Sequence, residues 1–176
     1  AKEGTLDPRE IYVPGIMVDT LVKAKPENHR MTCILDYDAS FTGEVKVPSD
    51  SIAPMEMGIR KVIAKRCAKE LQLDTTINLG IGVPVASVAL EAGIADRLTM
   101  TIEAGAIGGV PQGGHSLGAA ANVEVLIGQP NLFDFYDGGG LDQAFLGLAE
   151  CDKDGNINVS RFGPKIAGCG GFINIP

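Results

Sequence analysis

Glycine most constrains what this chain can fold into, because 23 of its 176 residues are glycine, against roughly 7% in an average protein. The excess is clustered. Clustered glycines let a backbone turn with positive φ and approach another backbone or a ligand closely. We therefore expect several irregular loops between the regular elements. The clusters are Gly80 with Gly82, six glycines within residues 105–118, Gly138–Gly140, and four glycines within residues 163–171.

Composition and charge limit the function classes. With 45% hydrophobic and 21% charged residues, the chain has the balance of a folded domain. A net charge of −7 provides no field for nucleic acid or an anionic membrane surface, so an anionic ligand must be bound by local groups. The longest uncharged stretch, Ala104–Val123, has the glycine-rich composition of loops rather than of a membrane span. The sequence begins without a basic-then-apolar leader, so we expect a cytoplasmic protein that binds neither nucleic acid nor membrane.

Cysteine, histidine and aspartate give no metal pattern. The cysteines lack the spacing of a zinc site and are interpreted as reduced structural thiols. The two histidines have no triad or zinc partners nearby in the sequence. Three aspartates around Gly138–Gly140 do not have calcium-loop spacing and are interpreted as turn residues. No metal is therefore expected. These residues are Cys33, Cys67, Cys151, Cys169, His29, His115, Asp134, Asp137 and Asp142.

The chain divides into an arm and a domain. Prolines interrupt residues 1–50, which are interpreted as an inter-domain arm, loop-like and then β-rich, with a turn at Thr42–Gly43. Residues 51–176 are expected to form the α/β domain. At its start, apolar residues recur at helical spacing over residues 54–71 and predict an amphipathic helix. Its five cations, Arg60 among them, are interpreted as a solvated face.

A strand, a glycine turn, a helix and a second strand follow in order. Thr75–Leu79 and Leu98–Ile102 have the pattern of short strands, and Val85–Ala92 that of a helix ended by Gly93. A helix between two strands favours a parallel pair. Two further strand-like runs, 145–151 and 156–162, flank a turn and predict a hairpin. We expect an α/β fold, an open and mainly parallel sheet with flanking helices and some antiparallel hairpin.

Glu103 is the candidate for chemistry. It directly follows the strand Leu98–Ile102 and precedes 20 residues without formal charge. Ligands of open α/β sheets bind outside the carboxyl ends of the strands. A glutamate at that boundary would be partly desolvated and more nucleophilic than in water. The alternative is that Glu103 caps a turn or pairs with Arg97.

The turn Gly80-Ile81-Gly82 lies at the carboxyl end of the preceding strand. Its backbone N–H groups could hold an anion or a developing oxyanion near Glu103. As a nucleotide-binding fingerprint it is weak, because the third glycine is missing. The alternative is a tight structural turn.

Four segments together resemble the class I coenzyme A transferases, and among these the single-chain propionate or acetate CoA-transferase branch. The opening stretches 4–9 and 13–16 are similar to the part that joins the two halves of such enzymes. The likeness runs over almost all of the chain, and its motifs are specific in combination. The segments are 78–84, 101–109, 133–140 and 158–172.

The resemblance implies the site and the reaction. Glu103 matches the family's nucleophile, which forms a covalent glutamyl-CoA thioester while CoA passes from a short-chain acyl-CoA to a carboxylic acid. The two oxyanion-hole loops fall on Gly80-Ile81-Gly82 and on residues 168–171, with the Ile81 N–H and a glycine N–H of the second loop as donors. Coenzyme A is then a co-substrate, and no cofactor is bound permanently. The glycines of the second loop are Gly168, Gly170 and Gly171.

Family members are much longer than this chain. We therefore expect a fragment of the C-terminal half, truncated at its C-terminus, inactive without the missing N-terminal half and prone to form homo-oligomers. Arg161 and Lys165 are candidates for contacts with CoA phosphates. A non-catalytic nucleotide- or CoA-binding module, or an acyl-CoA hydrolase, are the alternative functions. The sequence leaves open which short-chain acid is preferred.

Overall fold

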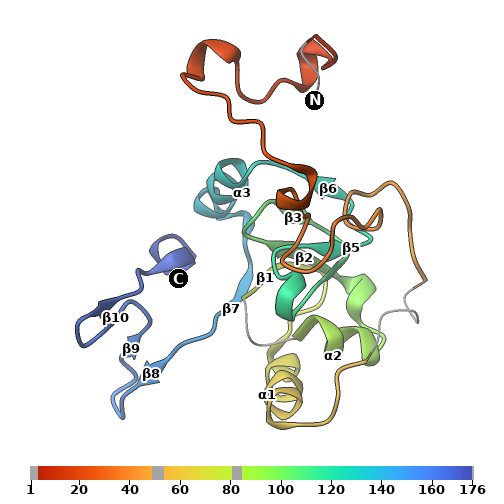
Figure 1. Cartoon of the computed structure of the whole chain (residues 1–176). Coiled ribbons are helices and arrows are strands. Elements are labelled where there is room, and N and C mark those ends of the chain that lie inside the picture. Colours follow the sequence, from red (N-terminus) through yellow and green to blue (C-terminus); the bar gives the residue numbers. More distant parts are fainter. Residues whose placement is uncertain (1–3, 49–53, 81–84, 176) are drawn as a thin grey trace.

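A five-stranded sheet with the order β6-β3-β2-β1-β7 forms the centre of the computed structural model, which describes residues 4–48, 54–80 and 85–175 (Figure 1). β1 (Thr75–Leu79) lies parallel to β2 (Leu98–Ile102) on one side and to β7 (Gln143–Phe145) on the other. β3 (Ala106–Ile107) and β6 (Val125–Leu126) extend the sheet in antiparallel pairing beyond β2. The expected α/β class is confirmed, with a sheet that is parallel at its centre.

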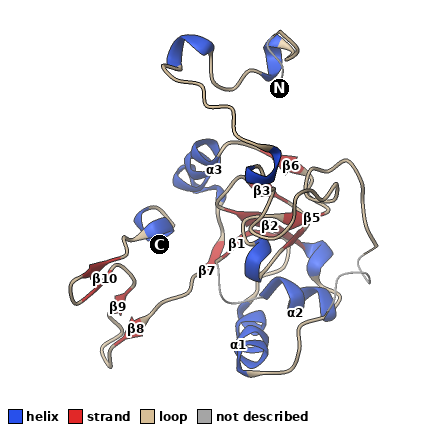
Figure 2. Ribbon diagram, in the orientation of Figure 1, coloured by secondary structure: helices blue, strands red, loops and turns tan. Residues whose placement is uncertain are grey.

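Short elements surround this sheet (Figure 2). The helices are α1 Ile59–Cys67, α2 Val85–Glu91, α3 Gln129–Phe135 and the π-helix η8 Tyr136–Gly140. The 3-10 helices are η1 Pro8–Glu10, η2 Gly15–Met17, η3 Pro26–Asn28, η5 Ala68–Glu70, η6 Ala95–Arg97, η7 Gly114–Ser116 and η9 Gly170–Ile173. The remaining strands form two-stranded pairs: β4 Val110–Pro111 with β5 Ala120–Ala121, β8 Glu150–Cys151 with β9 Ile157–Asn158, and β10 Arg161–Phe162 with β11 Lys165–Ile166.

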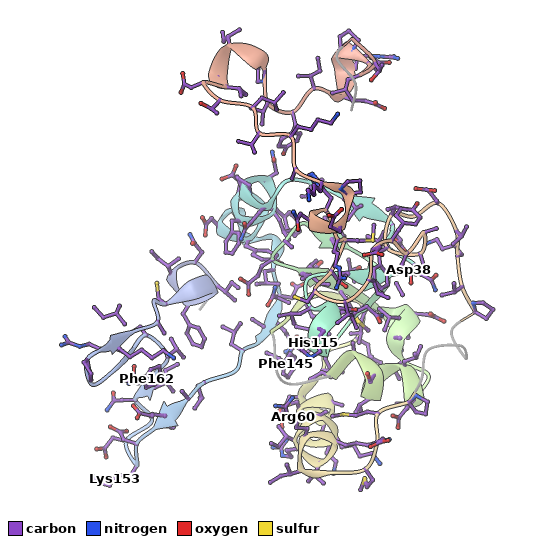
Figure 3. The ribbon with its side chains drawn as sticks, in the orientation of Figure 1. Asp38, Arg60, His115, Phe145, Lys153 and Phe162 are labelled. Carbon is purple, nitrogen blue, oxygen red and sulfur yellow. The ribbon has the colours of Figure 1, made fainter. Side chains whose placement is uncertain are left out.

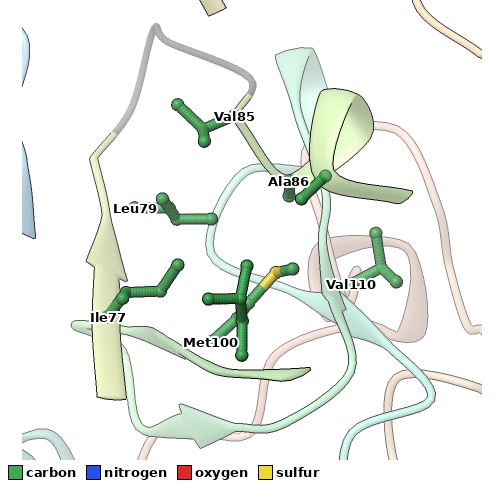
Figure 4. Close-up of a cluster of buried hydrophobic side chains, with 8 residues drawn as sticks. Ile77, Leu79, Val85, Ala86, Met100 and Val110 are labelled. Atoms are coloured by element: carbon green, nitrogen blue, oxygen red, sulfur yellow. The ribbon is translucent and has the colours of Figure 1, made fainter. Parts of the chain in front are cut away.

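The core lies between one face of the sheet and α2. The parallel register pairs Ile77 with Met100, so apolar residues of both strands point to the same face. There they pack against α2, as Figure 4 shows. Gly93 then ends α2 with φ +68°, so the predicted strand, helix and strand are all confirmed. The core residues are Ile77, Leu79, Val85, Ala86, Ala89, Leu98, Met100 and Val110.

The other face carries a buried polar network. The Thr101 hydroxyl donates to the Ile77 carbonyl oxygen at 2.8 Å. The Tyr136 hydroxyl donates to Thr101 Oγ1 at 2.7 Å and accepts from Asn78 Nδ2 at 3.0 Å. Because Tyr136 begins η8, this network fastens the π-helix to β1 and β2.

The chain reverses directly after β2. Residues 103–105 form a three-residue loop that leads into β3, and Gly105 adopts φ +117° there. A Cβ at Gly105 would lie 1.9 Å from the Ile127 carbonyl oxygen, so glycine alone fits this reversal. The reversal leaves Glu103 at the end of a sheet strand.

The predicted amphipathic helix forms as α1, but its apolar stripe is exposed except at the end, where Cys67 packs against the core. Ile59 is 79% exposed and Val62 54% exposed, whereas Ala64 is fully buried. Lys61 Nζ and Glu91 Oε1, 2.8 Å apart, join α1 to α2. Small residues and an ion pair therefore hold this helix in place.

The arm contradicts one expectation. No strand occurs in the described residues 4–48, so the β-rich prediction for this part is wrong. Its backbone hydrogen bonds go to loops instead, since Val47 N–H donates to Asn122 Oδ1 at 2.7 Å and Asn122 Nδ2 donates back to the Val47 carbonyl oxygen at 2.8 Å. The turn at Thr42–Gly43 is confirmed, with Gly43 at φ +79°.

The C-terminal segment differs in part from the prediction. The predicted hairpin forms around Asp152, whose Oδ1 accepts from the N–H groups of Asp154 and Asn156. The run 145–151 is not one strand, because Phe145 ends β7 in the sheet and only β8 belongs to the hairpin. Lys153 and Phe162 in Figure 3 mark this segment, which extends to one side of the sheet.

The network at Thr101 yields a stability test. Thr101→Val removes the hydroxyl that bonds Ile77 and Tyr136 and leaves buried partners unsatisfied, so we expect a loss of about 1–3 kcal/mol in the free energy of unfolding. Thr99→Val makes the same change at an exposed position of β2 and should stay within about 0.5 kcal/mol of wild type. Urea unfolding followed by circular dichroism measures both. Equal effects of the two variants would contradict the network's role.

Candidate functional site

Glu103 lies at the carboxyl end of β2, half-buried and without an ion pair to any described residue. Partial burial raises the pKa of its carboxyl group above the ordinary glutamate value. The alternative partner Arg97 is engaged elsewhere, because its guanidinium binds the Asp74 carboxylate. The pairing of Glu103 with Arg97 is therefore wrong, and Glu103 is a partly desolvated carboxyl group.

A cavity of about 800 Å³ opens beside Glu103. The ends of the two central strands contribute Leu79, Gly80 and Ile102 to its wall, and the glycine-rich loop after β4 closes another side. Among the described residues that line it, Glu103 and Arg60 carry the charges. The cavity is thus largely apolar, with one carboxylate and one guanidinium.

The second glycine loop reaches the carboxylate. A Cβ at Gly171 would lie 2.7 Å from Glu103 Oε2 and 2.9 Å from Glu103 Cδ, so a side chain there would require the carboxyl group or the loop to shift. Gly170 and Gly171 begin η9, and the first N–H groups of a helix have no partner within it. The structure therefore brings Glu103 and Gly171 together, as the resemblance implied.

The other loop glycines have different surroundings. Gly80 lines the cavity, but its N–H donates to the Phe145 carbonyl oxygen at 2.7 Å and belongs to the sheet. Ile81 and Gly82 lie outside the described residues. The Gly168 N–H donates to the Ser160 carbonyl oxygen at 3.1 Å.

The predicted phosphate contacts lie away from this cavity. Arg161 belongs to β10 and Lys165 to β11, both are exposed, and neither is among the described lining residues. Arg60, which Figure 3 labels on α1, is exposed as expected for a solvated face, but sequence reasoning missed that it also lines the cavity. Periodicity could not separate it from the other cations of α1, because the packing of α1 decides which cation lines the cavity.

Neither a metal site nor a membrane-spanning helix is found in the described ranges 4–48, 54–80 and 85–175. No group of three or more His, Cys, Asp or Glu side chains there is arranged to hold a metal ion. The same ranges contain no helix with the length and apolarity needed to cross a membrane. All four cysteines are free thiols.

Curated relatives cover nearly all of this chain. The chain is 42% identical over 183 residues to the caffeate CoA-transferase of Acetobacterium woodii. This alignment covers 99% of this chain and 35% of that protein. It is 34% identical over 176 residues to the acetate CoA-transferase YdiF of Escherichia coli strain K12, covering 99% of this chain and 33% of that protein. The chain thus spans about a third of the length of these relatives. No family model matches it.

Solved structures agree with this relationship. The apoenzyme of the acyl-CoA transferase YdiF from Escherichia coli O157:H7 matches with a TM-score of 0.78 and 33% identity, over 99% of this chain and 32% of that one. A thioester complex of the same transferase with CoA matches with the same TM-score. A variant of the decarboxylase AibA/AibB, at 21% identity and a TM-score of 0.53, shares the fold alone. Sequence and fold together show that nearly all of this chain is similar to about a third of these CoA-transferases, which confirms the resemblance to the class I coenzyme A transferase family.

Proposed function

We propose that this chain supplies the nucleophile and part of the acyl-CoA site of an enzyme that moves CoA from a short-chain acyl-CoA to a carboxylic acid. One observation carries the proposal: Glu103 is half-buried, forms no ion pair with a described residue and lies against the Gly171 backbone, beside a largely apolar cavity whose other charged lining residue is Arg60. A carboxylate in such surroundings loses hydration that would otherwise weaken it as a nucleophile.

The reaction proceeds through two covalent adducts. A Glu103 oxygen attacks the thioester carbonyl carbon, the C–S bond breaks, and CoA leaves as a thiolate while the acyl group remains in a mixed anhydride. The thiolate then attacks the Glu103 carbonyl carbon, which releases the first carboxylate and leaves a glutamyl-CoA thioester. A second carboxylate reverses both steps. The relative solved in a thioester complex with CoA supports this route.

Each attack creates a negatively charged oxygen that needs hydrogen-bond donors. The N–H groups of Gly170 and Gly171 start η9 beside Glu103 and are the proposed donors on one side. The Gly80 N–H bonds Phe145, and the Ile81 N–H, which lies outside the described residues, stays the proposed donor of the first loop. Replacing such a donor typically slows a reaction by about 10²–10³-fold.

Arg60 gives the cavity its positive charge and makes no ion pair with a described residue. We assign it to an anionic group of the ligand, either a CoA phosphate or the substrate carboxylate. Arg161 and Lys165 stay candidates for phosphate contacts outside this cavity.

The chain spans about a third of its curated relatives, so we propose that further polypeptide completes the pocket. The 176-residue chain by itself should then show little or no steady CoA transfer. We propose that the complete protein forms homo-oligomers.

Trapping the thioester tests the nucleophile. The complete polypeptide that contains these residues is mixed with acyl-CoA and treated with borohydride, which reduces a glutamyl thioester. We expect the reduced adduct on the peptide that carries Glu103, and we expect Glu103→Gln to abolish it and to slow CoA transfer by at least about a thousandfold. Glu10→Gln, on the exposed arm, is the matched control. Transfer at the normal rate by the Glu103 variant would refute the assignment, and free acid formed without an acceptor would indicate a hydrolase.

Gly171→Ala tests the second loop. The added methyl group would overlap Glu103 Oε2 and Ile175 Cδ1, so either the carboxyl group or the loop must shift, and the close contact between them is lost. We expect kcat to fall by about 10²-fold with a much smaller change in KM. Gly15→Ala adds a methyl group with no atom within 4 Å and should leave both parameters unchanged. An unchanged kcat for Gly171→Ala would exclude this loop from the reaction.

The raised pKa of Glu103 predicts a stability effect of defined sign. Between the ordinary and the raised pKa the folded state binds more protons than the unfolded state, so stability falls as the pH rises through this window. Glu103→Gln removes that penalty and should raise Tm by about 1–3 °C near pH 7. At about pH 3, where the carboxyl is protonated in both states, the difference should vanish. A lower Tm for the variant near pH 7 would mean that the folded protein stabilises the charge.

A further inference from the structure

The described C-terminal segment, residues 147–175, has one hydrogen-bonded link to the rest of the fold. Asn174 Nδ2 donates to both carboxylate oxygens of Asp137, at 3.1 and 3.3 Å. The other hydrogen bonds found for these residues stay within the segment. Both side chains are exposed, and their pair is the hydrogen-bonded anchor of this described segment.

Asn174 is coupled to the glycine loop through the backbone. The N–H groups of Asn174 and Ile175 both donate to the Gly171 carbonyl oxygen, at 3.2 and 3.0 Å. Gly171 in turn lies against the Glu103 carboxylate. Holding the Asn174 side chain therefore also holds Gly171.

Asp137 is fixed from the opposite side. It is the second residue of η8, and its neighbour Tyr136 is buried and bonded to Thr101, two residues before Glu103. A closed path of contacts thus runs from β2 through the π-helix and the Asp137–Asn174 pair to Gly171 and back to Glu103.

We infer that Asp137 and Asn174 are positioning residues that hold the second glycine loop at the Glu103 carboxylate. Neither residue is among those that line the cavity, so they act through Gly171. The kinetic consequence rests on the proposed function, whereas the structural consequence does not.

Exchanging the two side chains separates this role from simple stability. Asn174→Asp places a second carboxylate against Asp137 and removes the donor, so the contact becomes repulsive. The double variant Asp137→Asn with Asn174→Asp restores an amide that faces a carboxylate, in the reverse direction. If the pair positions the loop, the single variant should lose hydrogen-exchange protection and kcat, and the double variant should recover both.

Hydrogen exchange in the 176-residue chain measures the loop directly. The N–H groups of Phe172 and Ile175 bond Cys169 and Gly171 within the loop. We expect their exchange to speed up by about tenfold in Asn174→Asp and to return toward the wild-type rate in the double variant. Asp134→Ala, one helical turn before Asp137, should leave it unchanged.

Steady-state kinetics in the complete polypeptide measure the consequence. We expect Asn174→Asp to lower kcat by about 5- to 20-fold with KM for acyl-CoA nearly unchanged, and the double variant to recover most of it. Unchanged exchange in Asn174→Asp, or no recovery in the double variant, would overturn the inference. If exchange responds as expected but borohydride traps no adduct on Glu103, the pair stands and the proposed function fails.

Discussion

The site depends on a carboxyl group that directly follows a buried strand and forms no ion pair with a described residue. β2 is held on one face by the apolar core and on the other by the Thr101–Tyr136 network, so the backbone that carries Glu103 starts from a firmly packed strand. Charge at that position costs desolvation. This unfavourable desolvation is found at the place where the Gly171 backbone lies close to the carboxyl group.

The two sides of the site are built in different ways. The Glu103 side rests on sheet pairing and a packed core. The loop side rests on two short hairpins and one polar pair, Asp137 with Asn174. The nucleophile is therefore held by many contacts and the loop by few. Local opening takes place most readily where contacts are few, so we expect it in the loop.

The sequence pattern predicted the features that depend on residues close together in the chain. Thr75–Leu79 and Leu98–Ile102 were recognisable because their apolar residues are bounded by turns, and Glu103 was recognisable because a lone charge follows a buried strand. Long-range packing decided the rest. Whether Arg60 lines the cavity, whether the Gly80 N–H is taken by Phe145, and whether Asp137 meets Asn174 all depend on contacts between distant residues. The spacing of the apolar residues predicted the helix α1, but it did not predict that most of these residues are exposed to solvent.

The central claim is that the Glu103 carboxyl group itself joins the acyl group. The most direct measurement follows oxygen: the complete polypeptide turns over with an acceptor carboxylate labelled with ¹⁸O, and the peptide that contains Glu103 is weighed. Attack through an anhydride leaves a labelled oxygen in the glutamate side chain, so we predict an ¹⁸O atom in Glu103 after turnover. Labelled acyl-CoA formed while Glu103 stays unlabelled would contradict the account.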